Sequence, residues 1–402
     1  MAIRLLERRA LAAAATAACI ASTACAPPVS QTAAGSAINA PETGAFIVRL
    51  GADTVAVERF TRTADRLEGD LVTRTPNTRI AHYVVTLAPS GRPTRAEYTL
   101  RRPDGSPVPN APQSGTLAFA ADTVVSVVMR DTAITRRIAA RNGFPGLGLS
   151  FALVELGLRA LVASGRDSAD VTTVSFGAQN PSVFPTRFLR PDSARITWFG
   201  ASPQYVRTDR AGRILALDAT ATTFKVRVDR LPNVDIAAVA NAFATAEQTG
   251  RAFRMSVRDT VRATVGRANL LVDYGRPLRR GRTIFGGVVP FDTVWRTGAN
   301  AATQFRTDAD LTMGGVTIPA GTYTLWTVPS RDGAWKLVIN RQTGQWGTVY
   351  DPAQDLARVD LRTETVGTPV EQFTITVEPQ ADGGVLALAW DRTRAWVPFT
   401  VL

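Results

Sequence analysis

The sequence predicts a mainly β protein with two sheet-rich domains, an antiparallel curved sheet first and a β-sandwich of the jelly-roll type after it. Apolar and polar residues alternate along many short segments, and clusters of Pro, Asp and Gly separate these segments. Only two stretches of the folded part have a helical pattern. A chain of 402 residues also exceeds what one hydrophobic core usually organises, which favours two domains.

The first element is a predicted export signal over residues 1–25. Arginines near the start precede a small apolar run that is too short to span a bilayer. The run ends at residues 22–25, Ser-Thr-Ala-Cys, which resemble a lipobox, in which the cysteine is acylated. Cys25 is therefore the predicted lipidation site, and a lipid there would anchor the protein to a membrane. The expected location is the periplasm or the outer membrane.

Residues 26–42 are rich in Pro, Ala and Ser and have no periodicity, which is typical of a flexible tether. The only other cysteine, Cys19, lies inside the predicted signal. The folded part is therefore predicted to contain no disulfide, no thiol nucleophile and no thiolate metal site.

The alternating pattern predicts a first domain over residues 43–230, built as an antiparallel meander. In the segment 81–87, for example, every second residue is apolar, and turns such as Pro89-Ser90-Gly91 separate the runs. A helix near 149–163, with an apolar stripe, is expected to pack on the curved sheet. The expected strands lie near 45–50, 54–61, 66–75, 79–88, 94–102, 115–130, 170–176, 194–199, 204–208, 213–218 and 222–229.

Residues 231–258 are predicted to form a helical connector, because the alanine-rich segment 234–248 follows Pro232-Asn233. The segment 259–402 returns to strands and turns and contains six of the seven tryptophans, which favours a β-sandwich. The expected strands there include 323–328, 335–340, 373–377 and a pair, 385–390 and 395–401, around a turn at 391–394.

Several motifs follow one another in the C-terminal domain. They are Tyr274-Gly275-Arg276-Pro277, the glycine-containing stretch 281–287, Trp295-Arg296-Thr297-Gly298-Ala299-Asn300, Pro319-Ala320-Gly321-Thr322-Tyr323 and Gln345-Trp346-Gly347. Together, over roughly residues 260–402, they resemble the domain-of-unknown-function 2911 family of bacterial exported proteins. The resemblance implies a β-sandwich, often behind an export signal, and it implies no reaction. The N-terminal domain has no such resemblance.

The formal net charge is +12, and only Lys225 and Lys336 are lysines. Nucleic-acid binding is nevertheless not expected, because the arginines are spread through strands and turns and form no run or helical stripe. The expected partner is instead an unknown small molecule, a glycan or another envelope protein.

The segment 295–300 is the strongest candidate for a binding site. Trp295 offers a flat apolar ring, Arg296 a planar fork for a carboxylate or phosphate, and Asn300 both a donor and an acceptor. A structural role in the core or in loop anchoring is the alternative for each of these residues. Further candidates for the same ligand-binding site are Tyr274, Arg276, Arg282 and Trp346.

The common catalytic arrangements are missing from the sequence. His82 is the only histidine, no serine occupies a Gly-x-Ser-x-Gly elbow, and no phosphate loop is present. We therefore predict no catalytic residue, no metal and no cofactor, and the leading hypothesis is a non-enzymatic lipoprotein that binds a ligand or partner.

Two alternatives to that hypothesis stay open. One is a structural envelope component, and the other is a hydrolase of an envelope or extracellular polymer that uses two carboxylates. The candidate acids by type are Glu97, Glu155, Asp310, Asp351 and Asp355.

Overall fold

The computed structural model describes residues 40–197, 203–222 and 225–402, and it confirms the mainly β fold class. The described strands form two sheets, one of 15 strands and one of nine. The predicted signal, Cys25 and nearly all of the predicted tether lie outside the described residues. Within them, no helix is both long and apolar enough to cross a bilayer.

The first sheet is a meander in two halves that meet where β1 pairs with β15. Its strand order is β8-β7-β6-β5-β4-β3-β2-β1-β15-β14-β13-β12-β11-β10-β9, and only the β9–β10 pair is parallel. Its strands are β1 (Glu42–Leu50), β2 (Asp53–Arg62), β3 (Arg66–Thr73), β4 (Arg79–Leu87), β5 (Pro93–Arg101), β6 (Ser114–Phe119), β7 (Thr123–Met129), β8 (Ala133–Ala139), β9 (Phe144–Gly146), β10 (Ser168–Ser175), β11 (Ser182–Arg190), β12 (Ser193–Thr197), β13 (Pro203–Thr208), β14 (Ile214–Asp218) and β15 (Arg227–Leu231).

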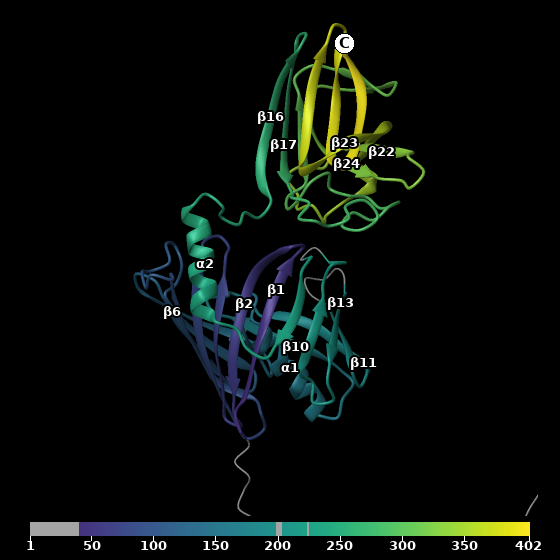
Figure 1. Ribbon diagram of the computed structural model, residues 1–402. Coiled ribbons are helices and arrows are strands. Elements are labelled where there is room, and N and C mark those ends of the chain that lie inside the picture. The colour runs from purple at the N-terminus through teal and green to yellow at the C-terminus, as the bar shows by residue number, and fades with distance from the viewer. Residues whose placement is uncertain (1–39, 198–202, 223–224) are drawn as a thin grey trace, which may run out of the picture. The chain divides into compact units, whose positions relative to one another are not determined.

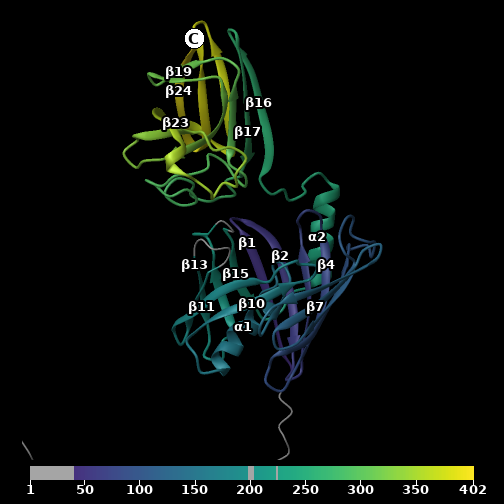
Figure 2. The ribbon, with the colours of Figure 1, turned by 180° about the vertical axis from the view of Figure 1, so that it is seen from behind.

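Helix α1 (Phe151–Ala163) lies against the concave face of this curved sheet (Figures 1 and 2). Ser150 caps its first turn, since the Ser150 side chain accepts a hydrogen bond from the backbone N–H of Leu153. Leu153, Leu156 and Phe151 are buried in one core with residues from both halves of the sheet. The helix predicted near 149–163 is therefore present, and its apolar stripe fills the interior of the sheet.

Helix α2 (Ile236–Gln248) occupies the segment for which a helical connector was expected. Its buried residues Ile236 and Ala240 form a small cluster with Val57 of β2 and Val72 of β3. Ala56 and Leu71 precede Val57 and Val72 in the sequence, face the opposite side of the sheet and belong to the main core. One side of α2 therefore packs on the convex face of the first sheet.

The second sheet has the order β16-β17-β18-β21-β22-β23-β24-β19-β20. Its strands are β16 (Val257–Val265), β17 (Ala268–Arg276), β18 (Thr303–Thr307), β19 (Leu311–Met313), β20 (Val316–Ile318), β21 (Gly321–Val328), β22 (Trp335–Asn340), β23 (Asp355–Gln380) and β24 (Gly383–Val401), and a 3₁₀ turn, η1 (Pro352–Gln354), precedes β23. The long strand β23 pairs with β22 through residues 355–361 and with β24 through residues 362–380. It therefore joins two layers that enclose a separate core of tryptophan, phenylalanine and aliphatic side chains.

The structure corrects the strand assignments at 115–130 and 385–401, and the strand predicted at 222–229 begins only at Arg227, as β15. The segment 115–130 is a hairpin of β6 and β7, in which Ala120 N–H donates to the Thr123 carbonyl across a turn. The segment 385–401, predicted as two strands around a turn, is the single strand β24, which continues through Asp391 at a φ of 53°. The local sequence misleads in both cases, because Asp-Arg-Thr-Arg resembles a turn although the strand continues through it, and Ala-Ala-Asp forms a turn without clearly interrupting an apolar run.

Candidate functional site

The motif at 295–300 lies in a loop that hydrogen-bonds to a second loop of the same sandwich. We call residues 295–302 the Arg296 loop and residues 341–350 the Trp346 loop. Trp295 and Thr327 exchange two backbone hydrogen bonds of 2.8 Å, which fix the start of the Arg296 loop on β21. Gly347 N–H donates to the Asn300 carbonyl at 3.0 Å, and Ala301 forms a β-bridge with Trp346. Two separated motifs of the sequence are thus brought together.

The Arg296 loop contains two non-glycine residues in the left-handed region, Thr297 at a φ of 51° and Asn300 at 64°. Asparagine adopts this conformation readily, whereas a β-branched residue there is a genuine outlier. Thr297 is fully buried, and its hydroxyl lies 2.8 Å from that of Thr327 within hydrogen-bonding distance. The surroundings thus hold Thr297 in a strained conformation, as often occurs at binding sites.

Arg296 is the cation at the centre of this loop pair. Its Nε is buried and has no hydrogen-bond partner within the described residues. Burial lowers the pKa of the guanidinium, and no ion pair found among the described residues includes it. A buried donor without an acceptor is costly, so an acceptor from outside the chain would stabilise this arrangement.

Position 347 of the Trp346 loop has room only for glycine. A Cβ atom at this position would lie 2.0 Å from Arg296 Cδ and 2.5 Å from the Asn300 carbonyl oxygen. The missing side chain therefore provides the space in which the stem of Arg296 lies.

Trp295 belongs in part to the core of the sandwich. Its ring stacks on that of Trp390 at 5.9 Å between centroids and meets Phe373 edge to face at 5.1 Å. Phe285 completes this aromatic cluster, with its ring 6.2 Å from Trp295. The indole is partly exposed, so that it both anchors the Arg296 loop and contributes apolar surface next to Arg296.

The other four predicted residues have diverse roles. Tyr274 is buried, and its hydroxyl oxygen accepts from Ile375 N–H at 3.0 Å. Arg276 is tied to β23 and to Asp259, while Arg282 donates to two backbone carbonyls, those of Leu278 and Arg279. Trp346 is 56% exposed.

Of the seven predicted site residues, Arg282, Trp295, Arg296 and Asn300 line one hollow, together with Trp326 and Tyr350. Tyr274, Arg276 and Trp346 do not line it. The sequence did not point to Trp326 or Tyr350, whose rings lie 5.0 Å apart, because nothing in their local pattern distinguishes them from core residues.

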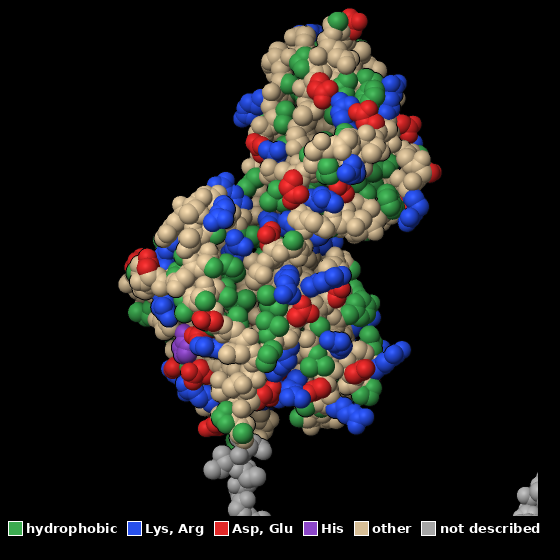
Figure 3. Space-filling model, viewed as in Figure 1, with side chains coloured by type: hydrophobic (Ala, Val, Ile, Leu, Met, Phe, Trp, Pro, Cys, Tyr) green, Lys and Arg blue, Asp and Glu red, His purple; other side chains and the backbone are tan. Residues whose placement is uncertain are grey.

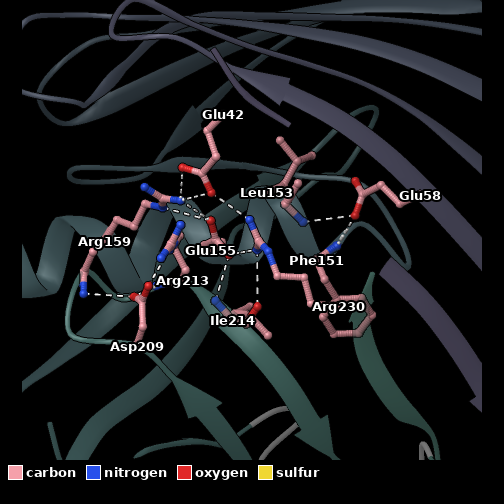
Figure 4. A network of polar contacts seen from close by, with 12 residues as sticks. Glu42, Glu58, Phe151, Leu153, Glu155, Arg159, Asp209, Arg213, Ile214 and Arg230 are labelled. Atoms are coloured by element: carbon pink, nitrogen blue, oxygen red, sulfur yellow. Dashed lines mark hydrogen bonds and ion pairs between the residues drawn. The ribbon is translucent and has the colours of Figure 1, made fainter. Parts of the chain in front are cut away.

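The acids considered for hydrolysis all have structural partners. Glu155 is buried in a network with Glu42, Arg159 and Arg230, in which both arginines lie 2.7 Å from its carboxylate (Figure 4). Glu97 pairs with Arg95, Asp310 accepts from Ala320 N–H, Asp351 accepts from Ala353 N–H, and Asp355 accepts from Tyr350, Asn340 and Arg358.

His82 lies on β4 with Nδ1 3.0 Å from Asp70 of the neighbouring strand, as a partly exposed surface pair. In the described ranges, no three His, Cys, Asp or Glu side chains gather so that they could hold a metal ion. On the face drawn in Figure 3, Lys and Arg side chains are interspersed with Asp and Glu instead of forming one basic patch.

Comparison with known proteins finds a family match for the C-terminal sandwich only. Residues 256–399 match the model of a family described as protein of unknown function (DUF2911). This match confirms the family resemblance, and the Arg296 and Trp346 loops both belong to the DUF2911 region. The N-terminal part has no family match, and no curated protein matches the chain.

Two solved structures are similar to parts of the chain. A protein of the DUF1089 family from Pseudomonas aeruginosa aligns with a TM-score of 0.30 and 11% identity. The alignment covers 40% of this chain and 89% of that protein. A β-barrel-like protein with a domain of unknown function 1849 from Brucella abortus aligns with a TM-score of 0.31 and 9% identity, covering 47% of this chain and 94% of that protein.

Proposed function

We propose that this protein is an exported, non-enzymatic binding protein, and that its DUF2911 region binds an anionic ligand at the Arg296 loop. The observation that carries the proposal is the buried Nε of Arg296, which has no acceptor within the described residues. A carboxylate or phosphate supplies such an acceptor, and the guanidinium fork can donate two parallel hydrogen bonds to it.

The neighbouring side chains favour a ligand that also has a flat or apolar part. Trp295, Trp326 and Tyr350 line the same hollow as Arg296 and provide aromatic surface. An acidic sugar combines these properties, since its ring packs on an indole while its carboxylate pairs with arginine. The strained Thr297 supports the proposal independently, because strain of this kind is usually retained for binding or catalysis.

The binding prediction is tested with a trimer of galacturonate as the anionic probe and maltotriose as the neutral probe. Arg296→Met keeps the aliphatic stem beside Gly347 and removes the donors. We expect it to weaken binding of the acidic trimer at least tenfold in isothermal titration calorimetry, because charge-assisted hydrogen bonds are lost. The unliganded variant should be more stable than the original chain by about 1 kcal/mol, since a buried unpaired donor is removed.

Arg306→Met is the matched control, because Arg306 is exposed on β18 of the same sheet. It should bind the acidic trimer like the original chain. Equal affinities of the Arg296 variant and the control would contradict the proposed site, and so would equal binding of maltotriose and the acidic trimer.

The export part of the proposal rests on the sequence pattern of residues 1–25. We expect cells that express the full chain and grow with radioactive palmitate to label the protein, and we expect Cys25→Ala to abolish the label. The label should fractionate with membranes. A labelled Cys25→Ala variant would show that acylation occurs elsewhere, and an unlabelled original chain would exclude the lipid anchor.

A further inference from the structure

A separate cavity lies on the concave side of the first sheet, and it does not involve the Arg296 loop. It is formed by β2 to β5, by residues 111–112, by residues 146–149 between the end of β9 and α1, and by residues 175–176 at the end of β10. Its volume is ≈ 330 Å³. Small-molecule sites in proteins range from roughly 300 to 1,000 Å³, so this cavity is large enough for a ligand.

The walls of the cavity are mostly apolar. Tyr98 and Phe176 form an aromatic side, with their ring centroids 4.4 Å apart. The Tyr98 hydroxyl donates to the Pro112 carbonyl at 3.2 Å, so the phenol is already satisfied and its ring faces serve as packing surface. The remaining apolar lining comes mainly from Val55, Leu71, Leu100, Leu147 and Leu149.

Arg79 supplies a positive charge at this apolar cavity. Its Nε donates to the Thr73 hydroxyl at 3.3 Å and its Nη2 to the Thr75 carbonyl at 2.7 Å, and both acceptors are uncharged. Within the described part of the chain, no ion pair includes Arg79. By contrast, Arg59 of β2 pairs with Asp70 of β3. Burial lowers the pKa of Arg79, which indicates a partly desolvated cation.

We propose that this cavity holds the alkyl chain of an amphipathic anion whose carboxylate or phosphate group pairs with Arg79. The apolar walls match a hydrocarbon chain, and the guanidinium, which already uses Nε and Nη2, has Nη1 available for the anion. A water molecule occupies about 30 Å³ of the liquid and a methylene group is of similar size, so the cavity accommodates a chain of roughly ten carbons.

The proposal is tested on the full chain by calorimetry with decanoate, decyl phosphate, hexanoate and 1-decanol, below their aggregation concentrations. We expect saturable binding of one decanoate per chain, with 1-decanol and hexanoate each at least tenfold weaker. The alcohol lacks the charge that pairs with Arg79. The shorter acid leaves part of the apolar wall uncovered, and each missing methylene lowers the affinity about fourfold. Tighter binding of decyl phosphate than of decanoate would assign a phosphate headgroup, and the reverse a free fatty acid.

Two variants locate the site. Arg79→Met should weaken decanoate at least tenfold and leave 1-decanol unchanged, while Arg101→Met, which is exposed on the adjacent strand β5, should change neither. Ala81→Leu enlarges a side chain that lines the cavity and should abolish binding of both ligands. No saturable decanoate binding, or undiminished binding to Arg79→Met and Ala81→Leu, would overturn the proposal.

Discussion

Replacing Glu58 by leucine is expected to lower the free energy of unfolding by about 3–5 kcal/mol, the largest effect of any polar substitution that we anticipate. Glu58 lies on β2 and is fully buried, although its side chain is ionisable. Its carboxylate accepts hydrogen bonds from the hydroxyls of Tyr83 and Ser150 and from the N–H groups of Phe151 and Ala152.

These bonds join the sheet to the start of α1, where backbone N–H groups have no partners within the helix. Burial raises the pKa of Glu58, and the four donated bonds oppose this rise. Leucine would fill the same space but leave all four donors buried without acceptors. Because the helix fills the interior of the first sheet, the loss should loosen α1 before the rest of the chain.

Urea unfolding and hydrogen exchange of peptides from residues 151–163 measure this effect. Glu58→Leu should speed exchange in α1 strongly, and Glu58→Gln should do so less, since an amide retains one acceptor. Glu68→Leu on the neighbouring strand is the control, because Glu68 is a half-exposed partner of Arg66. Unchanged exchange in α1 of Glu58→Leu would show that these bonds do not hold the helix.

The fold class followed from the sequence because side-chain alternation and turn residues are local properties. The strands near 79–88 and 94–102, for instance, appear within one residue as β4 and β5. The strands β8 and β11 were missed, since most of their residues are exposed or partly exposed and give no clear alternation. The function of Glu58 was also not visible, because three of its four donors lie more than 90 residues away from it along the chain.

The candidate site was predicted in part. The motif at 295–300 marked the Arg296 loop correctly as a distinctive segment, yet sequence could not show which residues share its hollow. Tyr274 and Arg276 lie about 20 residues before the motif in the sequence, but both form hydrogen bonds with β23 instead. Which side chains converge depends on the pairing of distant strands, and that pairing is set by the whole core.

Replacing Trp390 by alanine is expected to cost about 3–5 kcal/mol in the DUF2911 region, because a large buried side chain is removed from a packed aromatic cluster. Trp390 is 1% exposed, stacks on Trp295 and contacts Phe373 and Phe285 with ring centroids 5.8 and 6.4 Å away. Trp346→Ala is the matched control, since the same change at a 56% exposed ring should alter stability by less than about 0.5 kcal/mol.

Comparison of Trp390→Ala with Arg296→Met also separates packing from binding. Because Trp390 supports Trp295, Trp390→Ala should weaken the near-ultraviolet circular dichroism of the cluster, speed hydrogen exchange in β24 and reduce affinity for the galacturonate trimer. Arg296→Met, in contrast, should reduce that affinity with the dichroism and exchange unchanged, since its guanidinium bonds to no described residue through Nε. If Trp390→Ala were as stable as Trp346→Ala, the aromatic cluster would not be the core that positions the Arg296 loop.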